Sequence, residues 1–152
     1  MQQIRAEIDG LPRPGVSWVI FFEKRVFVLS RNIRLAELFE PAGGDYVFKE
    51  IGDNEISLEY FIHNAREAEI LFINPWYAPP RSKSDLIRRN PALAPLKALS
   101  AEGRSYLVRE ELFRDTGRLD EALRDLAATM HPAVYPNREP LFFVPLPLKK
   151  LD

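Results

Sequence analysis

The stretch Ile70-Leu71-Phe72-Ile73-Asn74-Pro75 decides the expected fold of this chain. Four consecutive apolar residues end at an Asn-Pro pair, where regular structure tends to stop. A strand that is apolar on both faces is typical of a parallel sheet with helices covering its two sides. We therefore expect an α/β protein in which this run is a buried strand.

The segments around this run predict further strands and helices. Two β-rich runs, 16–22 and 25–29, are joined by the polar pair Glu23-Lys24 and predict a hairpin whose turn type stays open. Apolar spacing predicts helices at about 32–41, 57–68, 84–90 and 119–130, and strands at 46–48, 105–108 and 141–144. The sequence thus predicts a three-layer α/β/α sandwich with a mostly parallel sheet that starts from a β-hairpin.

The first residues look like the end of a helix that started further upstream. Ile4 and Ile8 share one helical face, and Gly10 supplies the stop. The next five residues, Leu-Pro-Arg-Pro-Gly at 11–15, form a stiff connector because both prolines lack an amide donor. A chain that opens in this way looks cut from something longer. We expect a helix end at 1–10 and a single α/β lobe at 11–152.

Composition narrows the class of protein. A length of 152 residues suits one domain, and a net charge of −1 without a basic stripe argues against nucleic acid as a partner. The absence of cysteine excludes disulfides and Cys-based metal sites. No apolar run approaches the roughly 20 residues of a membrane span, and the N-terminus lacks the apolar stretch of a secretory signal. The protein is therefore either cytosolic or a processed or truncated extracytoplasmic chain.

Catalytic signatures are missing. Gly43-Gly44 ends a helix instead of opening a phosphate loop, and no serine has the Gly-flanked context of a nucleophile elbow. His63 lies within a predicted helix and His131 at a helix end, where structural roles are the simpler interpretation. We expect no enzyme, no catalytic residues, no cofactor and no metal site made of protein side chains.

The loop after the buried strand carries the best candidates for ligand contacts. Ligands of open α/β sheets bind at the carboxyl ends of the strands, where Trp76 and Tyr77 offer faces for stacking and Arg81 can pair with a carboxylate or phosphate. The alternative is that the aromatic residues cover the end of the core. Arg109, which follows the strand at 105–108, should face the same edge, although charged residues after strands are commonly plain surface.

Glu59 stands in the first turn of the helix predicted from Ser57. On its own this is ordinary helix electrostatics, in which a carboxylate near the N-terminus contributes roughly 0.3–1 kcal/mol.

The order of these segments resembles the C-terminal lobe of the class III, helical-backbone, periplasmic solute-binding proteins of ABC importers. Residues 11–18 resemble the exit from the family's backbone helix, and 35–48, with Ala-Gly-Gly-Asp-Tyr at 42–46, resemble its next segment. Residues 56–59 and 65–73 are similar to its Ser-x-Glu helix and the strand that follows. Residues 86–106 are similar to the next helix, connector and strand. The likeness covers about residues 8–145.

The resemblance implies a lobe without chemistry of its own. Residues 1–10 would be the end of the helix between two lobes, and the cleft between them would hold a metal chelate: a ferric siderophore, haem or cobalamin. Arg31 and Asn32 would lie near the ligand, because they flank Ile33, at a place where the family often has a small polar residue. Glu59 matches the position of the carboxylate that docks on arginines of the ABC permease. The full-length protein would be periplasmic or otherwise extracytoplasmic.

Other interpretations stay open. The chain could be a stand-alone, non-catalytic α/β interaction module, and an isolated lobe could form a homodimer through Trp76 and Tyr77. A hydrolase or transferase is disfavoured, because the sequence shows no nucleophile-base pair. The upstream reading frame discriminates between a lobe and a module. The identity of the ligand, the permease and the oligomeric state are not readable from the residues.

Overall fold

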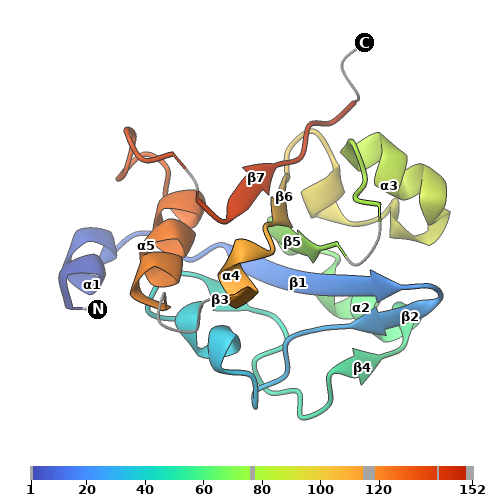
Figure 1. The fold of residues 1–152 in the computed structure, drawn as a ribbon, viewed down its shortest axis with the longest axis horizontal. Helices are drawn as coiled ribbons and strands as arrows, with labels where there is room; N and C mark the ends of the chain where they lie inside the picture. Colours follow the sequence, from blue (N-terminus) through green and yellow to red (C-terminus); the bar gives the residue numbers. More distant parts are fainter. Residues whose placement is uncertain (1, 76–77, 115–118, 140, 150–152) are drawn as a thin grey trace.

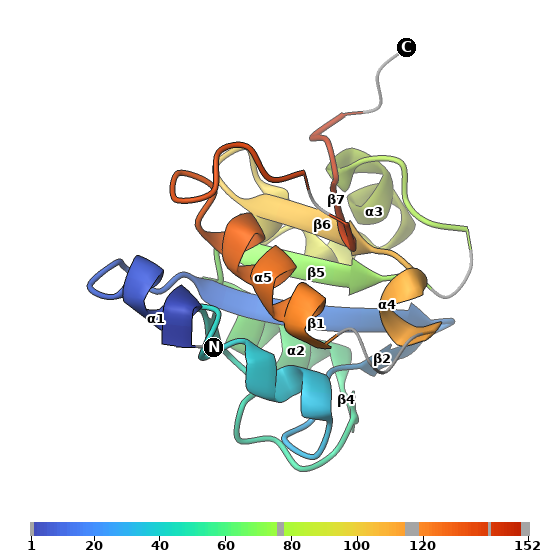
Figure 2. The same cartoon turned by 60° about the vertical axis from the view of Figure 1, so that its left-hand side comes forward.

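The computed structural model of the protein describes residues 2–75, 78–114, 119–139 and 141–149 and has one mixed β-sheet between helices (Figures 1 and 2). The strands are β1 (Gly15–Phe22), β2 (Arg25–Phe27), β3 (Asp45–Tyr46), β4 (Glu55–Ile56), β5 (Ile70–Asn74), β6 (Arg104–Val108) and β7 (Phe143–Pro145). The α-helices are α1 (Gln2–Ile8), α2 (Leu58–Ala65), α3 (Lys83–Arg89), α4 (Glu111–Arg114) and α5 (Leu119–Met130). Three 3₁₀ helices complete this part of the chain: η1 (Arg34–Leu38), η2 (Pro91–Leu93) and η3 (Lys97–Leu99).

The centre of the sheet is parallel and its sides are antiparallel. The strand order is β4-β2-β1-β5-β6-β7, with β3 beside the start of β1. β5 pairs in parallel with β1 and β6, and β3 in parallel with β1. β2, β4 and β7 pair in antiparallel fashion with their neighbours. The α/β fold, the buried strand β5 and the opening hairpin are confirmed. The sheet is mixed because the hairpin partner β2 and the long-range partners β4 and β7 add antiparallel strands at both sides.

Some expected elements differ in extent. The helix expected at 32–41 is the short 3₁₀ helix η1, because Ile33 still has an extended backbone and Pro41 has no amide to continue a helix. Strand β4 was not expected, since two residues cannot show an alternating pattern. Helix α2 ends at Ala65, three residues before the expected end.

Aromatic packing on Trp18 holds one face of the sheet to its cover. The Trp18 ring lies 5.5 Å from Phe72 on the neighbouring strand, 6.0 Å from Phe39 and 6.1 Å from Phe143, measured between centroids. Trp18 is completely buried. Such pairs contribute about 0.5–1.5 kcal/mol each beyond the area that they bury. In Figure 2, α5 lies in front of the sheet on one side, and α2 lies behind it.

On the α2 side, Phe21 of β1 makes the contact, from the strand face opposite to Trp18. The Phe21 ring meets Phe61 of α2 edge-on at 6.2 Å, and Phe48 stacks on Phe61 at 5.7 Å. The two faces of β1 are thus used in alternation, as the twofold repeat of a strand requires.

Helix α3 depends on the far end of the chain. Its N-cap Ser82 accepts a hydrogen bond from the amide of Asp85. The amides of Lys83 and Ser84 donate to the carbonyls of Pro147 and Leu148 at 2.8 and 3.0 Å. The first turn of α3 is therefore completed by the C-terminal segment, which satisfies amides that a helix leaves unpaired.

Gly103 provides a test of the turn that leads into β6. A Cβ at this position would lie 2.1 Å from the carbonyl oxygen of Lys97 and 2.4 Å from Cα of Ala98, so the backbone would have to move. We expect Gly103→Ala to lower the free energy of unfolding by more than about 2 kcal/mol in urea denaturation. Gly52→Ala is the control, because its Cβ would meet nothing closer than 3.6 Å. Equal stability of the two variants would contradict this reading of the turn.

Candidate functional site

Three parallel strands end at one edge of the sheet. β1, β5 and β6 finish at Phe22, Asn74 and Val108, and the register that pairs Ile20 with Asn74 keeps these ends together. Figure 2 shows the three arrows pointing to the same side, with α1 at the opposite end. The hairpin turn and the loops that follow β5 and β6 therefore share the carboxyl edge, where ligands of open α/β sheets bind.

A hollow with mostly apolar walls lies on one face of the hairpin at this edge. We call it the hairpin hollow, and it has a volume of about 380 Å³. It is lined by Ile20, Phe22, Arg25, Phe27, Val28, Leu29, Ile33 and Asn54. The size and chemistry suit the apolar part of an organic ligand better than a bare ion.

A second hollow opens on the other face of the hairpin, and we call it the edge hollow. It has a volume of about 490 Å³ and lies between the hairpin turn, the start of α2 and the end of α3. Its floor includes Phe21, Leu58 and Leu86, and its wall includes Ala78 and Arg89. This hollow is more polar at its rim because charged residues of the turn and of α3 surround it.

Arg31 and Asn32 lie beside the hairpin hollow. Both are exposed, and they flank Ile33, which lines it, but neither is among the lining residues. The amide of Arg31 donates to the carbonyl of Ile51 at 2.8 Å, and the side-chain amide of Asn32 donates to the carbonyl of Gly52 at 3.3 Å. Arg31 is therefore held through its backbone and Asn32 through its side chain, while both residues remain exposed.

The other expected ligand residues spread along the same edge. Arg81 and Arg109 are exposed, in the loops after β5 and β6, and the Arg109 amide donates to the carbonyl of Phe142 at 2.7 Å. Neither side chain lines one of the two hollows. Trp76 and Tyr77 lie outside the described residues, so their expected role in stacking stays a prediction.

Asp85 of α3 is the centre of a charged cluster that was not predicted from the sequence. Its buried carboxylate is paired with Arg88 and with Arg89, at 3.0 Å for the latter, and accepts a hydrogen bond of 3.0 Å from the amide of Arg81. The hydrogen bond from Arg88, followed by the one from the Arg81 amide, lowers the pKa of Asp85. The sequence spacing of Asp85, Arg88 and Arg89 predicts i, i+3 and i+4 ion pairs on a helix. It does not predict that these residues also contact the loop before α3.

Glu59 is exposed in the first turn of α2, as expected. Ser57 caps the helix by accepting a hydrogen bond of 3.1 Å from the amide of Tyr60. The neighbouring Tyr60 is 49% exposed, which leaves an aromatic ring beside the carboxylate. The start of α2 thus presents a free carboxylate and a ring on a fixed scaffold.

Arg25 is already engaged in a two-point ion pair. Its guanidinium contacts the carboxylate of Glu55 at 2.6 and 2.9 Å and lies 5.0 Å from the centroid of the Phe27 ring. The hydrogen bond from Arg25 lowers the pKa of Glu55. This pair ties β2 to β4, so Arg25 holds the rim of both hollows instead of offering a free cation.

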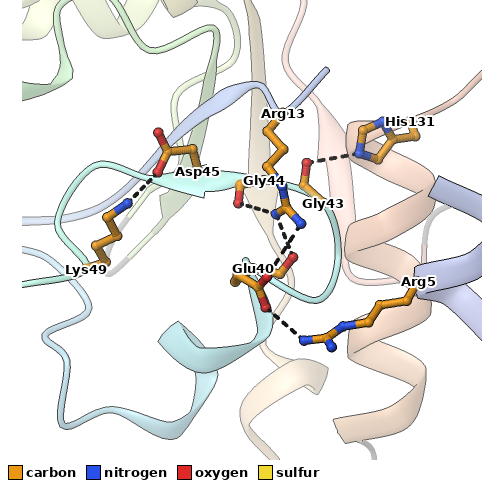
Figure 3. A network of polar contacts seen from close by, with 8 residues as sticks. All are labelled: Arg5, Arg13, Glu40, Gly43, Gly44, Asp45, Lys49 and His131. Atoms are coloured by element: carbon orange, nitrogen blue, oxygen red, sulfur yellow. Dashed lines mark hydrogen bonds and ion pairs between the residues drawn. The ribbon is translucent and has the colours of Figure 1, made fainter. Parts of the chain in front are cut away.

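A polar network at the opposite edge fixes α1 and its connector to the lobe (Figure 3). The carboxylate of Glu40 forms ion pairs with Arg5 at 3.3 Å and with Arg13 at 3.5 Å. The Arg13 guanidinium also donates to the carbonyl of Glu40 at 2.9 Å. His131 lies 3.0 Å from the carbonyl of Gly43, whose φ of 91° suits glycine. His131 therefore has a structural contact, far from the carboxyl edge.

No group of three or more His, Cys, Asp or Glu side chains could hold a metal ion in the part of the chain that the structure describes. Among the helices that the structure describes, none combines the length and the apolar character of a membrane span.

Comparison with known proteins defines the class of the fold. No family model matches the chain. It is 26% identical over 140 residues to an uncharacterized lipoprotein of Methanocaldococcus jannaschii, an alignment that covers 88% of this chain and 32% of that protein.

Solved structures match more of the architecture. A periplasmic haem-binding protein from Pseudomonas aeruginosa has a TM-score of 0.70 at 23% identity, covering 99% of this chain and 54% of the other. An ABC transporter substrate-binding protein from Listeria monocytogenes EGD-e has a TM-score of 0.66 at 16% identity, with coverage of 86% and 52%. Helicobacter pylori CeuE with Ni(II) bound has a TM-score of 0.65 at 20% identity, with coverage of 91% and 44%.

The chain therefore has the α/β fold of one lobe of a periplasmic binding protein. It spans about half the length of these structures and about a third of the curated lipoprotein. This share fits a single lobe and agrees with the C-terminal lobe that the motifs resemble. The Pseudomonas protein is described as a haem-binding protein and the Listeria protein as a substrate-binding protein.

The lowered pKa of Asp85 predicts how stability changes with pH. Because the folded pKa lies below the unfolded value of about 4, the carboxylate stabilises the fold above that value and loses this effect as the pH falls through the folded pKa. We expect Asp85→Asn to be less stable than the parent near pH 7, with the difference shrinking in acid. Unfolding free energies measured between about pH 7 and pH 2 test this. A stability difference between Asp85→Asn and the parent that stays constant from pH 7 to pH 2 would contradict the role of this carboxylate.

Proposed function

We propose that the chain is the C-terminal lobe of an extracytoplasmic solute-binding protein of an ABC importer. The observation that carries the proposal is the shared carboxyl edge of β1, β5 and β6, which bears the hairpin hollow and exposed cationic side chains. One lobe offers half of a cleft, and small-molecule ligands are normally buried over most of their surface. The second half would come from another lobe.

Residues 1–10 would end the helix that joins the two lobes, and residues 11–152 would form the lobe itself. Ile4 and Ile8 of α1 are each only 6% exposed, and Arg5 and Arg13 both bind Glu40. Support for a rigid connection comes from this combination of apolar burial and ion pairs. A helix seated in this way would transmit its orientation to the lobe.

The proposed ligand is a metal chelate: a ferric siderophore, haem or cobalamin. The Pseudomonas protein is described as haem-binding and the Helicobacter protein carries Ni(II), which supports this class. The mostly apolar hairpin hollow suits the organic part of a chelate, and Arg31, Asn32, Arg81 and Arg109 at the same edge suit its anionic groups. Trp76 and Tyr77 would stack on its flat face.

Glu59 would dock the lobe on the permease. Its carboxylate is exposed at a helix start whose position is fixed by the Ser57 cap, which supports a role in orienting a complex. A cation from the permease would then find its partner without reorganisation of the lobe. Charge pairs of this kind set orientation and register.

The isolated chain should bind chelates weakly or not at all, because half a cleft leaves much of the ligand in water. Titration of ferric siderophores, haem and cobalamin, followed by intrinsic Trp fluorescence, measures this for the chain and for the product of its complete reading frame. We expect saturable binding of one chelate by the longer protein only. Micromolar or tighter binding by the isolated chain would refute the half-cleft argument, and a longer protein that binds none would refute the function.

Glu59→Gln should weaken docking without changing ligand affinity. An interfacial charge pair can be worth about 1.5 kcal/mol, so the concentration of binding protein needed for half-maximal importer ATPase activity should rise roughly tenfold. The measurement uses the importer in proteoliposomes with the loaded, full-length protein. Glu67→Gln is the control, because Glu67 is exposed beyond the other end of α2. Equal behaviour of both variants would remove Glu59 from the docking surface.

A further inference from the structure

The segment between β5 and α3 contains backbone groups that regular structure cannot satisfy. Pro79 and Pro80 have no amide hydrogen, so this part of the loop cannot join a strand ladder or a helix through its own donors. Its carbonyl groups therefore need donors from elsewhere, or water. Arginine is suited to this task because its guanidinium carries five N–H donors in a fixed plane.

Arg89 of α3 supplies those donors. Its Nη1 donates to the carbonyl of Ala78 at 2.7 Å, and its Nη2 lies 3.5 Å from the carbonyl of Pro79. The same Nη2 is 3.0 Å from Oδ2 of Asp85. One guanidinium thus reaches both the loop and a buried carboxylate on its own helix.

Asp85 holds the other end of the loop. Its Oδ2 accepts a hydrogen bond of 3.0 Å from the amide of Arg81, the first residue after the two prolines that has an amide hydrogen. Asp85 is itself fixed, because it is 8% exposed and its amide donates to the Ser82 hydroxyl. The loop from Ala78 to Arg81 is therefore attached to α3 at both ends by two side chains, Asp85 and Arg89.

The attached loop forms part of the wall of the edge hollow. Ala78, Pro80 and Arg89 line that hollow, and Phe21 and Lys24 of the hairpin also line it. A shift of the loop relative to α3 would change the width of this opening. The attachment thus acts on the shape of the carboxyl edge, and not only on the stability of α3.

We propose that Asp85 and Arg89 are positioning residues that set the place of the loop from Ala78 to Arg81 and thereby the affinity for ligand at the carboxyl edge. This inference rests on the proposed function, because it takes that edge as the ligand surface. Neither residue needs to touch the ligand. Their effect passes through the backbone of Ala78, Pro79 and Arg81.

The chain provides a matched control for Arg89. Arg88 is its neighbour on α3 and pairs with the same carboxylate of Asp85. Among the residues that the structure describes, Asp85 is the polar partner of Arg88, and none of the loop residues from Ala78 to Arg81 is bonded to it. Arg88→Gln and Arg89→Gln therefore remove one charge each from the same cluster, and only the second removes the bond to the loop. Arg89→Lys is a further variant, because one ammonium group cannot reach the carboxylate and both carbonyls as the guanidinium does.

The first measurement follows the loop without any ligand. Trypsin cleaves after Arg81, and its rate at that bond reports how often the loop leaves α3. We expect at least a fivefold higher rate in Arg89→Gln, a smaller increase in Arg89→Lys and no more than a twofold change in Arg88→Gln. Similar melting temperatures of the three variants show that the fold is retained. Equal cleavage in Arg88→Gln and Arg89→Gln would overturn the attachment.

The second measurement is chelate affinity in the product of the complete reading frame, with the siderophore, haem or cobalamin that the parent protein binds. We expect at least a tenfold higher Kd in Arg89→Gln and an unchanged Kd in Arg88→Gln. Faster cleavage with unchanged affinity would overturn the positioning role and leave the proposed function standing. A parent protein that binds no chelate would overturn the proposed function and with it the ligand role, while cleavage would still decide the attachment.

Discussion

The structure depends on the parallel pairing of β5 with both β1 and β6. Register brings Ile70 opposite Val16 on one side and opposite Arg104 on the other, so the three strands start side by side and run toward the same edge. β5 is buried along its four apolar residues, which places its backbone hydrogen bonds out of reach of water. Everything that the carboxyl edge can do follows from this alignment, because a slip of the register would separate the loops and turn each side chain to the other face.

The same alignment explains why much of the fold was predictable from the sequence. Ile70–Ile73 is apolar without interruption, and only burial on both faces accounts for such a run. The hairpin, the Ser57 cap and the limits of α5 also follow from local patterns, and the structure has them. What local patterns could not supply was β4, whose two residues form a strand only because β2 is beside them, and the 3₁₀ form of η1.

The candidate site was predictable to a lesser degree. Glu59, Arg81 and Arg109 were expected from the helix start and the strand ends beside them, and Arg31 and Asn32 only from the family resemblance. The structure exposes all five residues. The edge hollow could not be expected, because it forms between segments that are far apart along the chain, and the hairpin hollow depends on how residues 20–33 fold back on themselves beside Asn54. The contact between Arg89 and Ala78 is of the same kind: helical spacing shows the pair with Asp85, but only the tertiary fold brings the loop carbonyls within reach.

The dependence of α3 on the C-terminal segment has a consequence for biosynthesis. The hydroxyl of Ser84 donates to the carbonyl of Leu148, a partner 64 residues further along the chain. The amides of Lys83 and Ser84 also find their hydrogen-bond acceptors in this segment. At a translation rate of about 5–20 residues per second, the ribosome needs on the order of ten seconds to make the intervening chain. During that interval the backbone amides at the start of the nascent helix lack these hydrogen-bond acceptors. The first turn of α3 can therefore be completed only after residues 147–148 have left the exit tunnel.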